Sequence, residues 1–183
     1  MRNICRFLLK LFGWTVVNGV MPDKKAVILA VPHTSAWDPV YAYLYYTSVG
    51  GIVHVVIKKQ FFFWPLGFIL KKVGAIPIDR SHSTPVIRQI IETMKDSETF
   101  HLAIAPEGTR KKTTRWKGGF HTIAKATGAT VYMGVLDYDK KQVGWKETVL
   151  LADTPAESVK RVKAYYRTLD IKGKNPDQFT AEE

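Results

Sequence analysis

Apolar residues along this chain gather in short runs, and longer segments with a helical pattern lie between them. A short apolar run bounded by turn-forming or charged residues favours a buried strand, because it is too short for an ordinary helix. Such runs predict strands at residues 26–31, 52–57, 75–78, 101–105 and 131–136. The chain is therefore expected to build a sheet.

Helices are expected between and after these strands. The dipeptide Thr84-Pro85 suits a helix start, because proline is tolerated in a first helical turn, and this helix is expected to run to about Lys95. Gly128 suits the end of a helix over residues 118–127, and residues 158–169 predict a last one. The alternation predicts an α/β fold, in which helices flank a largely parallel sheet in layers.

The length of 183 residues suits a single domain, residues 1–183, with a sizeable core. Residues 1–20 predict an amphipathic helix whose apolar face meets either the core or a membrane, and Lys10 interrupts that stretch too early for a signal peptide. Its apolar residues recur at helical spacing: Ile4, Phe7, Leu8, Leu11 and Phe12. No run approaches the roughly 18 apolar residues that span a bilayer, and the single Cys5 fits a reducing compartment, so we expect a cytoplasmic protein.

Two polar clusters follow predicted strands, and the first contains His33 and Asp38. Pro32 ends the strand over residues 26–31, so His33 is expected on a turn at the strand end, where α/β proteins place their chemistry. A histidine can take a proton from an attacking hydroxyl, and a carboxylate on its other ring nitrogen fixes the tautomer. Taken alone, the pair would favour a structural histidine bonded to a backbone carbonyl over a catalytic base.

The second cluster, Glu107-Gly108-Thr109-Arg110, follows the predicted strand over residues 101–105. Gly108 permits a positive φ or the close approach of a ligand, Thr109 offers a hydroxyl, and Arg110 offers a planar fork for phosphate oxygens. A solvated turn would explain the same tetrapeptide. Since two strand ends can share one edge of a sheet, the two clusters are expected to place a histidine base beside an anion-binding turn.

In this order the clusters resemble the motifs of the glycerolipid acyltransferase family, of the lysophosphatidic acid acyltransferase type. His33 and Asp38 match its first motif, His-x4-Asp, and residues 107–110 match its third motif, Glu-Gly-Thr-Arg. Residues 74–80 resemble the second motif, which ends in Arg80. The resemblance spans residues 26–136 and implies an O-acyltransferase of phospholipid biosynthesis.

The resemblance also implies roles for individual residues. His33 is expected to be the general base and Asp38 the residue that orients it. Acceptor binding is implied for Arg80, Glu107, Gly108, Thr109 and Arg110. The implied acceptor is a membrane lipid with a free hydroxyl, and the donor is a thioester of acyl carrier protein or coenzyme A. No bound cofactor and no metal are expected, since no second His or Cys lies at ligand spacing.

The net charge of +11 requires a partner, and part of the excess lies in a run after the third motif. This run comprises Lys111, Lys112, Arg115, Lys117 and Lys125. It suits anionic head groups, an acidic carrier protein or coenzyme phosphates, although part of it would also suit a solvated loop. The alternative is a nucleic-acid-binding module without catalysis, with Trp116, Phe120 and Trp145 as stacking platforms, but we expect no nucleic-acid partner.

Residues 58–72 contain paired lysines around an apolar, aromatic centre. That centre is too short to cross a bilayer, and Pro65 and Gly67 disfavour a long helix. Its membrane contacts are expected at Phe61, Phe62, Phe63 and Trp64. We therefore expect peripheral attachment to an anionic membrane surface, on the inner face of the membrane, although packing of these aromatics on the sheet would explain them too.

Overall fold

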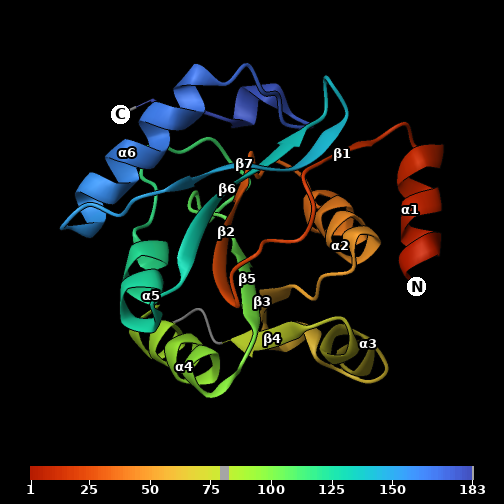
Figure 1. Ribbon diagram of the computed structural model, residues 1–183, viewed down its shortest axis with the longest axis horizontal. Coiled ribbons are helices and arrows are strands. Elements are labelled where there is room, and N and C mark those ends of the chain that lie inside the picture. Colours follow the sequence, from red (N-terminus) through yellow and green to blue (C-terminus); the bar gives the residue numbers. More distant parts are fainter. Residues whose placement is uncertain (79–82, 183) are drawn as a thin grey trace.

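The computed structural model describes residues 1–78 and 83–182, and its helices and strands alternate along much of the chain (Figure 1). The helices are α1 (Arg2–Leu11), α2 (Asp38–Val49), α3 (Leu66–Lys72), α4 (Ser83–Asp96), α5 (Gly119–Thr127) and α6 (Pro155–Thr168), with short 3-10 turns η1 (Lys59–Phe61) and η2 (Pro176–Gln178). The strands are β1 (Thr15–Val17), β2 (Lys25–Val31), β3 (His54–Lys58), β4 (Ala75–Ile78), β5 (Phe100–Ile104), β6 (Thr130–Asp137) and β7 (Gln142–Val149).

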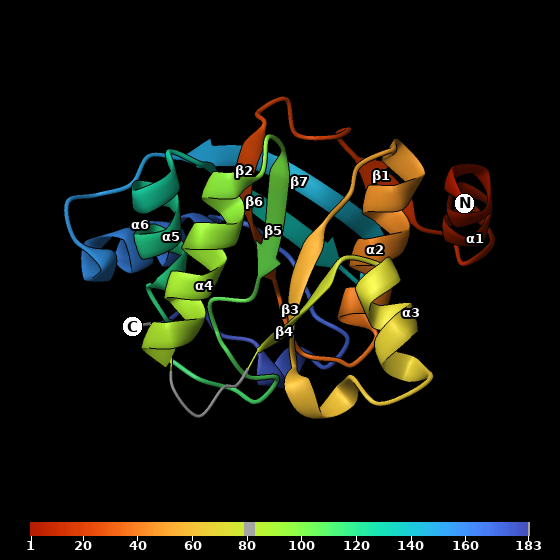
Figure 2. The same cartoon turned by 90° about the horizontal axis from the view of Figure 1, so that it is seen from below.

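The described strands form one sheet in the order β1-β7-β6-β2-β5-β3-β4. The five strands from β6 to β4 are mutually parallel, whereas β7 runs antiparallel to β6 and β1 runs parallel to β7. Helices cover both faces: α4, α5 and α6 lie on one side, and α1, α2 and α3 on the other (Figures 1 and 2). The predicted α/β fold with a largely parallel sheet is confirmed.

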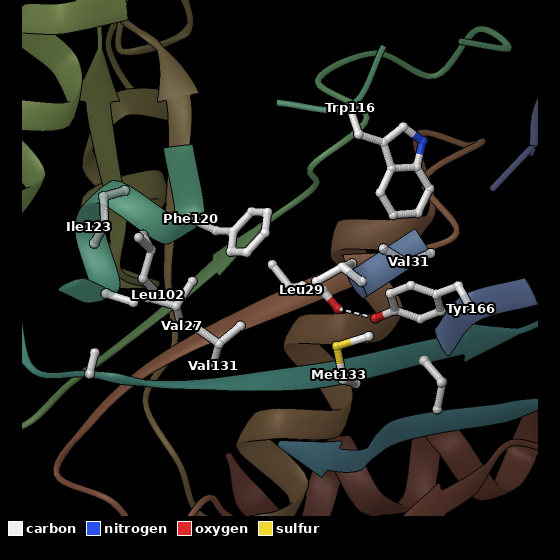
Figure 3. Packing of buried hydrophobic residues seen from close by; sticks show 14 of the residues in the cluster. Val27, Leu29, Val31, Leu102, Trp116, Phe120, Ile123, Val131, Met133 and Tyr166 are labelled. Carbon is white, nitrogen blue, oxygen red and sulfur yellow. Dashed lines mark hydrogen bonds between the residues drawn. The ribbon is translucent and has the colours of Figure 1, made fainter. Parts of the chain in front are cut away.

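The central strand β2 is buried on both faces, which explains its unbroken apolar sequence. Val27 and Leu29 pack toward α5 and α6, whereas Ala26 and Ile28 belong to the cluster on the α2 side. Figure 3 shows the cluster on the α5 and α6 side, where the Tyr166 hydroxyl of α6 donates to the carbonyl oxygen of Leu29 at 3.4 Å. The same hydroxyl lies 2.7 Å from the carbonyl oxygen of Gly134. These hydrogen bonds tie α6 to the middle of the sheet.

The amino-terminal helix is shorter than predicted. α1 ends at Leu11 because Gly13 takes a left-handed φ of +76°, which an α-helix does not continue, and Thr15–Val17 then pairs with β7. The expectation of one helix over residues 1–20 was therefore wrong in its second half. Within the described residues, the structure contains no helix with the length and hydrophobicity needed to cross a membrane.

Candidate active site

The first and third motifs lie side by side because β2 and β5 are parallel neighbours in the sheet. Leu29 pairs with Ile104, so the chain leaves both strands at the same edge. There, the backbone N–H of His33 donates to Glu107 Oε1 at 3.1 Å. The prediction that the two strand ends share one edge is confirmed.

The pairing of His33 with Asp38 arises from a tight turn that leads into α2. Asp38 Oδ2 accepts the backbone N–H groups of Thr34 and Ser35, each at 2.8 Å, and lies 3.1 Å from His33 Nδ1. Because an ionised carboxylate can only accept, this contact places the proton of a neutral imidazole on Nδ1 and leaves Nε2 as the basic nitrogen. The Asp38 side chain is 4% exposed and that of His33 is 22% exposed, so only the histidine reaches solvent appreciably.

The second oxygen of Asp38 binds a residue that no motif indicated. Tyr138, directly after β6, donates its hydroxyl to Asp38 Oδ1 at 2.8 Å. Burial, and then the hydrogen bond to Asp38, raise the pKa of Tyr138, so the phenol keeps its proton and acts as a donor.

Glu107 points into the protein and is 6% exposed. Burial, with repulsion from Asp38 as a smaller cause, raises the pKa of Glu107 to about 8, although the His33 N–H opposes this shift. Its Oε2 is buried and has no hydrogen-bond partner among the described residues. In this structure, then, the glutamate of the third motif contacts the backbone of the first motif.

The rest of the third motif forms an exposed turn. Gly108 has a φ of +65°, and its N–H donates to the carbonyl oxygen of Ala105 at 3.1 Å. A Cβ at Gly108 would lie 2.9 Å from Lys117 Cε, so both the positive φ and the close approach of Lys117 favour glycine at this position. Thr109 Oγ1 accepts the N–H of Lys111 at 3.2 Å, and Arg110 is exposed.

Arg80 lies outside the described residues. The strand before it, β4, runs parallel to β3 and ends at Ile78, on the edge of the sheet where β2 and β5 end. Acceptor binding by Arg80 therefore stays a prediction.

The segment after α6 covers the turn of the first motif. The sequence did not predict this contact. Asn175 Nδ2 donates to the carbonyl oxygen of Thr34 at 2.8 Å, and the Asn175 N–H donates to Thr34 Oγ1 at 3.3 Å. The Lys174 ammonium lies 5.3 Å from the ring centroid of Trp37, which is 52% exposed. Nothing local in the sequence signals these contacts, because they join residues more than 130 positions apart.

The aromatic segment after β3 is largely exposed. Phe61 is 44% exposed, Phe63 59%, Trp64 87% and Phe68 70%, whereas Phe62 is half-buried. Packing against the sheet therefore does not explain most of these rings. As the sequence predicted, no long helix forms here, since η1 and α3 are separated by a turn.

The aromatic residues that the nucleic-acid alternative required are not open platforms. Trp116 is 7% exposed and Phe120 is fully buried. Trp145 is half-buried and donates its Nε1–H to the carbonyl oxygen of Gly19 at 2.9 Å. These rings pack within the fold, so they do not support the nucleic-acid alternative.

A paired histidine and carboxylate thus lie at the carboxyl edge of the parallel strands, beside an exposed glycine turn that carries an arginine. The family model described as Acyltransferase matches residues 15–135. The chain belongs to this acyltransferase family.

Two individual proteins give a more detailed comparison. The chain is 28% identical over 137 residues to a 1-acyl-sn-glycerol-3-phosphate acyltransferase of Streptococcus pneumoniae, which is 69% of this chain and 51% of the relative. The chain thus spans about half the length of that curated relative. The crystal structure of the 1-acyl-sn-glycerophosphate acyltransferase PlsC from Thermotoga maritima superposes with a TM-score of 0.62 at 16% identity. The match covers 95% of this chain and 80% of that one, and it supports the same fold.

Proposed function

We propose that this protein transfers a fatty acyl group from a thioester to the hydroxyl of a lysophospholipid, with 1-acylglycerol 3-phosphate as the first candidate acceptor. The observation that carries the proposal is the pair of His33 Nδ1 and Asp38 Oδ2, 3.1 Å apart at the sheet edge. Membership of the acyltransferase family and the names of the two similar proteins support the same reaction.

In the proposed mechanism His33 is the general base. Its Nε2 removes the proton of the acceptor hydroxyl while the hydroxyl oxygen attacks the thioester carbonyl carbon. Asp38 stabilises the imidazolium that forms. The tetrahedral intermediate then collapses with cleavage of the carbon–sulfur bond, and the imidazolium returns its proton to the departing thiolate. No covalent acyl-enzyme is required.

We assign acceptor binding to the third motif together with Arg80. Arg110 is exposed beside the Gly108 turn, where a guanidinium can bind phosphate oxygens in a bidentate manner. Thr109 adds a hydroxyl, and Gly108 lets a ligand approach the backbone. Glu107 belongs to the same motif, and its contact with the His33 backbone supports a role in shaping the site as well as in binding.

The donor is proposed to approach over the basic run that follows the motif. All five of its side chains are exposed: Lys111, Lys112, Arg115, Lys117 and Lys125. Clustered positive charge raises the local concentration of anions, and the phosphates of coenzyme A and the acidic surface of an acyl carrier protein both carry negative charge.

The protein is proposed to attach peripherally to an anionic membrane surface on the cytoplasmic side, where it reaches its lipid acceptor. Exposed rings at Phe61, Phe63 and Trp64 lie between lysine pairs, Lys58 with Lys59 and Lys71 with Lys72. Helix α1, on the same side of the sheet as α3 (Figure 1), exposes a second apolar surface formed by Ile4, Phe7 and Leu11, and Phe12 directly after the helix extends it. Rings in the interface and lysines among the head groups would bind without a spanning helix.

The direct test is an assay of the purified protein with vesicles that contain lysophosphatidate or another lysophospholipid. Acyl-coenzyme A and acyl carrier protein thioesters are supplied in separate reactions, and products are identified by mass spectrometry. We expect a doubly acylated phospholipid and release of the free thiol. Absence of acylated product with every donor and acceptor pair would contradict the proposal.

A further inference from the structure

One partner of the Asp38 carboxylate lies outside the residues that the family model matches. Asp38 Oδ2 is held by the turn itself, whereas Asp38 Oδ1 accepts the hydroxyl of Tyr138 at 2.8 Å. Tyr138 is 100 positions from Asp38 and beyond the matched residues 15–135. The carboxylate is thus bound both by the turn after β2 and by Tyr138 after β6.

The tyrosine is itself fixed in place. Its backbone N–H donates to the carbonyl oxygen of Lys172 at 2.8 Å. Its ring meets Trp14 edge-on at 5.0 Å between centroids and Tyr41 at 5.8 Å, with interplanar angles of 84° and 87°. A ring held on two sides points its hydroxyl at Asp38 without needing to be ordered when substrate binds.

We propose that Tyr138 is a positioning residue for the proton-transfer pair, and that its hydroxyl sets both the orientation of Asp38 and the basicity of His33. The inference rests on the proposed function, in which His33 is the general base. The O–H donor neutralises part of the charge on Asp38, so the carboxylate holds the His33 Nδ1 proton less strongly than an unshared carboxylate would.

Loss of this hydroxyl has a defined electrostatic consequence. Asp38 would then stabilise the His33 imidazolium more strongly, so the protonated ring would be favoured relative to the wild type. Among the described residues, Glu107 after β5 interacts with Asp38, and Tyr41 of α2 interacts with Tyr138. Near the same turn, Lys172 and Asp139 pair with each other and Lys174 lies over Trp37. A Tyr138→Phe substitution changes none of them.

The test compares Tyr138→Phe with Tyr41→Phe. Both variants keep their ring, and Tyr41 lies in the same aromatic cluster, but within the described part of the chain its hydroxyl forms no hydrogen bond. The titration of His33 is followed by nuclear magnetic resonance of nitrogen-labelled histidine, and its signals are assigned with His33→Ala. We expect the midpoint to rise by about half a pH unit in Tyr138→Phe and to stay within about 0.1 unit in Tyr41→Phe.

Turnover gives a second readout. In Tyr138→Phe we expect kcat to fall about 10-fold, because Asp38 loses the hydrogen bond from the tyrosine hydroxyl. The KM of the acceptor should change less than about 2-fold, because this hydrogen bond does not involve the acceptor. An unchanged His33 midpoint in a folded Tyr138→Phe protein would overturn the inference and leave Tyr138 as a packing residue. The titration needs no substrate, so it decides the role of Tyr138 even if the wild-type protein transfers no acyl group and the proposed function fails.

Discussion

The backbone N–H of His33 donates to Glu107 Oε1 at 3.1 Å, which joins the first and third motifs across 74 positions of sequence. The contact fixes the start of the turn that carries the imidazole. The other oxygen of Glu107 is buried without a partner among the described residues, which disfavours the ionised form of the carboxyl group.

The raised pKa of Glu107 predicts a pH-dependent stability. The folded-state pKa is about 8, against 4.5 for an ordinary glutamate, so between these values the folded state binds more protons than the unfolded state. The free energy of unfolding should therefore fall as pH rises from about 4.5 to about 8.

Glu107→Gln tests this pH dependence, because it keeps an acceptor for the His33 N–H and removes the titrating group. The free energy of unfolding of the variant should rise relative to that of the wild type through this pH range, by an amount on the order of a few kcal/mol. Urea unfolding at about pH 5 and about pH 8.5 measures it, and parallel pH dependence in the two proteins would contradict the raised pKa.

Asp38→Asn should separate chemistry from folding. The amide oxygen can still accept from Thr34 and Ser35, and the Tyr138 hydroxyl can turn to accept from the amide, so we expect a stability loss of only about 1 kcal/mol. A neutral amide does not stabilise the imidazolium of His33, so kcat should fall by about 100-fold or more. Thermal unfolding and initial rates test both statements, and a kcat near that of the wild type would show that Asp38 has no electrostatic role.

Arg110→Lys tests acceptor recognition by exchanging a guanidinium fork for a point charge. With a phosphate-bearing acceptor, the KM of the acceptor should rise about 10-fold and that of the donor should change little. Arg167→Lys, at an exposed position on α6, is the matched control. Equal effects of Arg110→Lys on both substrates would indicate a structural defect and not loss of a phosphate contact.

Vesicle co-sedimentation tests membrane attachment. The wild-type protein should bind anionic vesicles, added salt should weaken binding, and Phe63→Ser combined with Trp64→Ser should reduce it several-fold without unfolding the protein. Leu150→Ser removes a comparably exposed apolar side chain after β7 and should bind as the wild type does. Undiminished binding by the double variant would leave the exposed face of α1 as the anchor.

The sequence predicted those parts of the fold whose signal is local. Residues 26–31 and 75–78 were recognisable because buried parallel strands are continuous apolar runs, and they correspond to β2 and β4. β7 was missed because Lys146, Glu147 and Thr148 are exposed and polar, and α2 was missed although Asp38-Pro39 opens it. α6 begins at Pro155, earlier than predicted, because Thr154 and Glu157 form a capping box.

In the candidate site, too, the sequence predicted only the residues whose signal is local. His33, Asp38 and residues 107–110 are visible as short motifs, and their proximity follows from the order of parallel strands. Tyr138 and Asn175 contact the first motif only through the folded chain. Residues that meet across 100 or more positions form no short sequence motif, so the contacts of Tyr138 and Asn175 could be found only in the structure.

The proposed role of His33 as the base for acyl transfer is tested by the turnover of folded His33→Ala. The imidazole is 22% exposed at the sheet edge, so its removal should leave thermal unfolding within a few degrees of the wild type. Acyl transfer to the lysophospholipid, measured as initial rate under saturating donor, should fall by about 100-fold or more, as expected when a positioned general base is lost. Near wild-type turnover by a folded His33→Ala protein would exclude His33 as the general base.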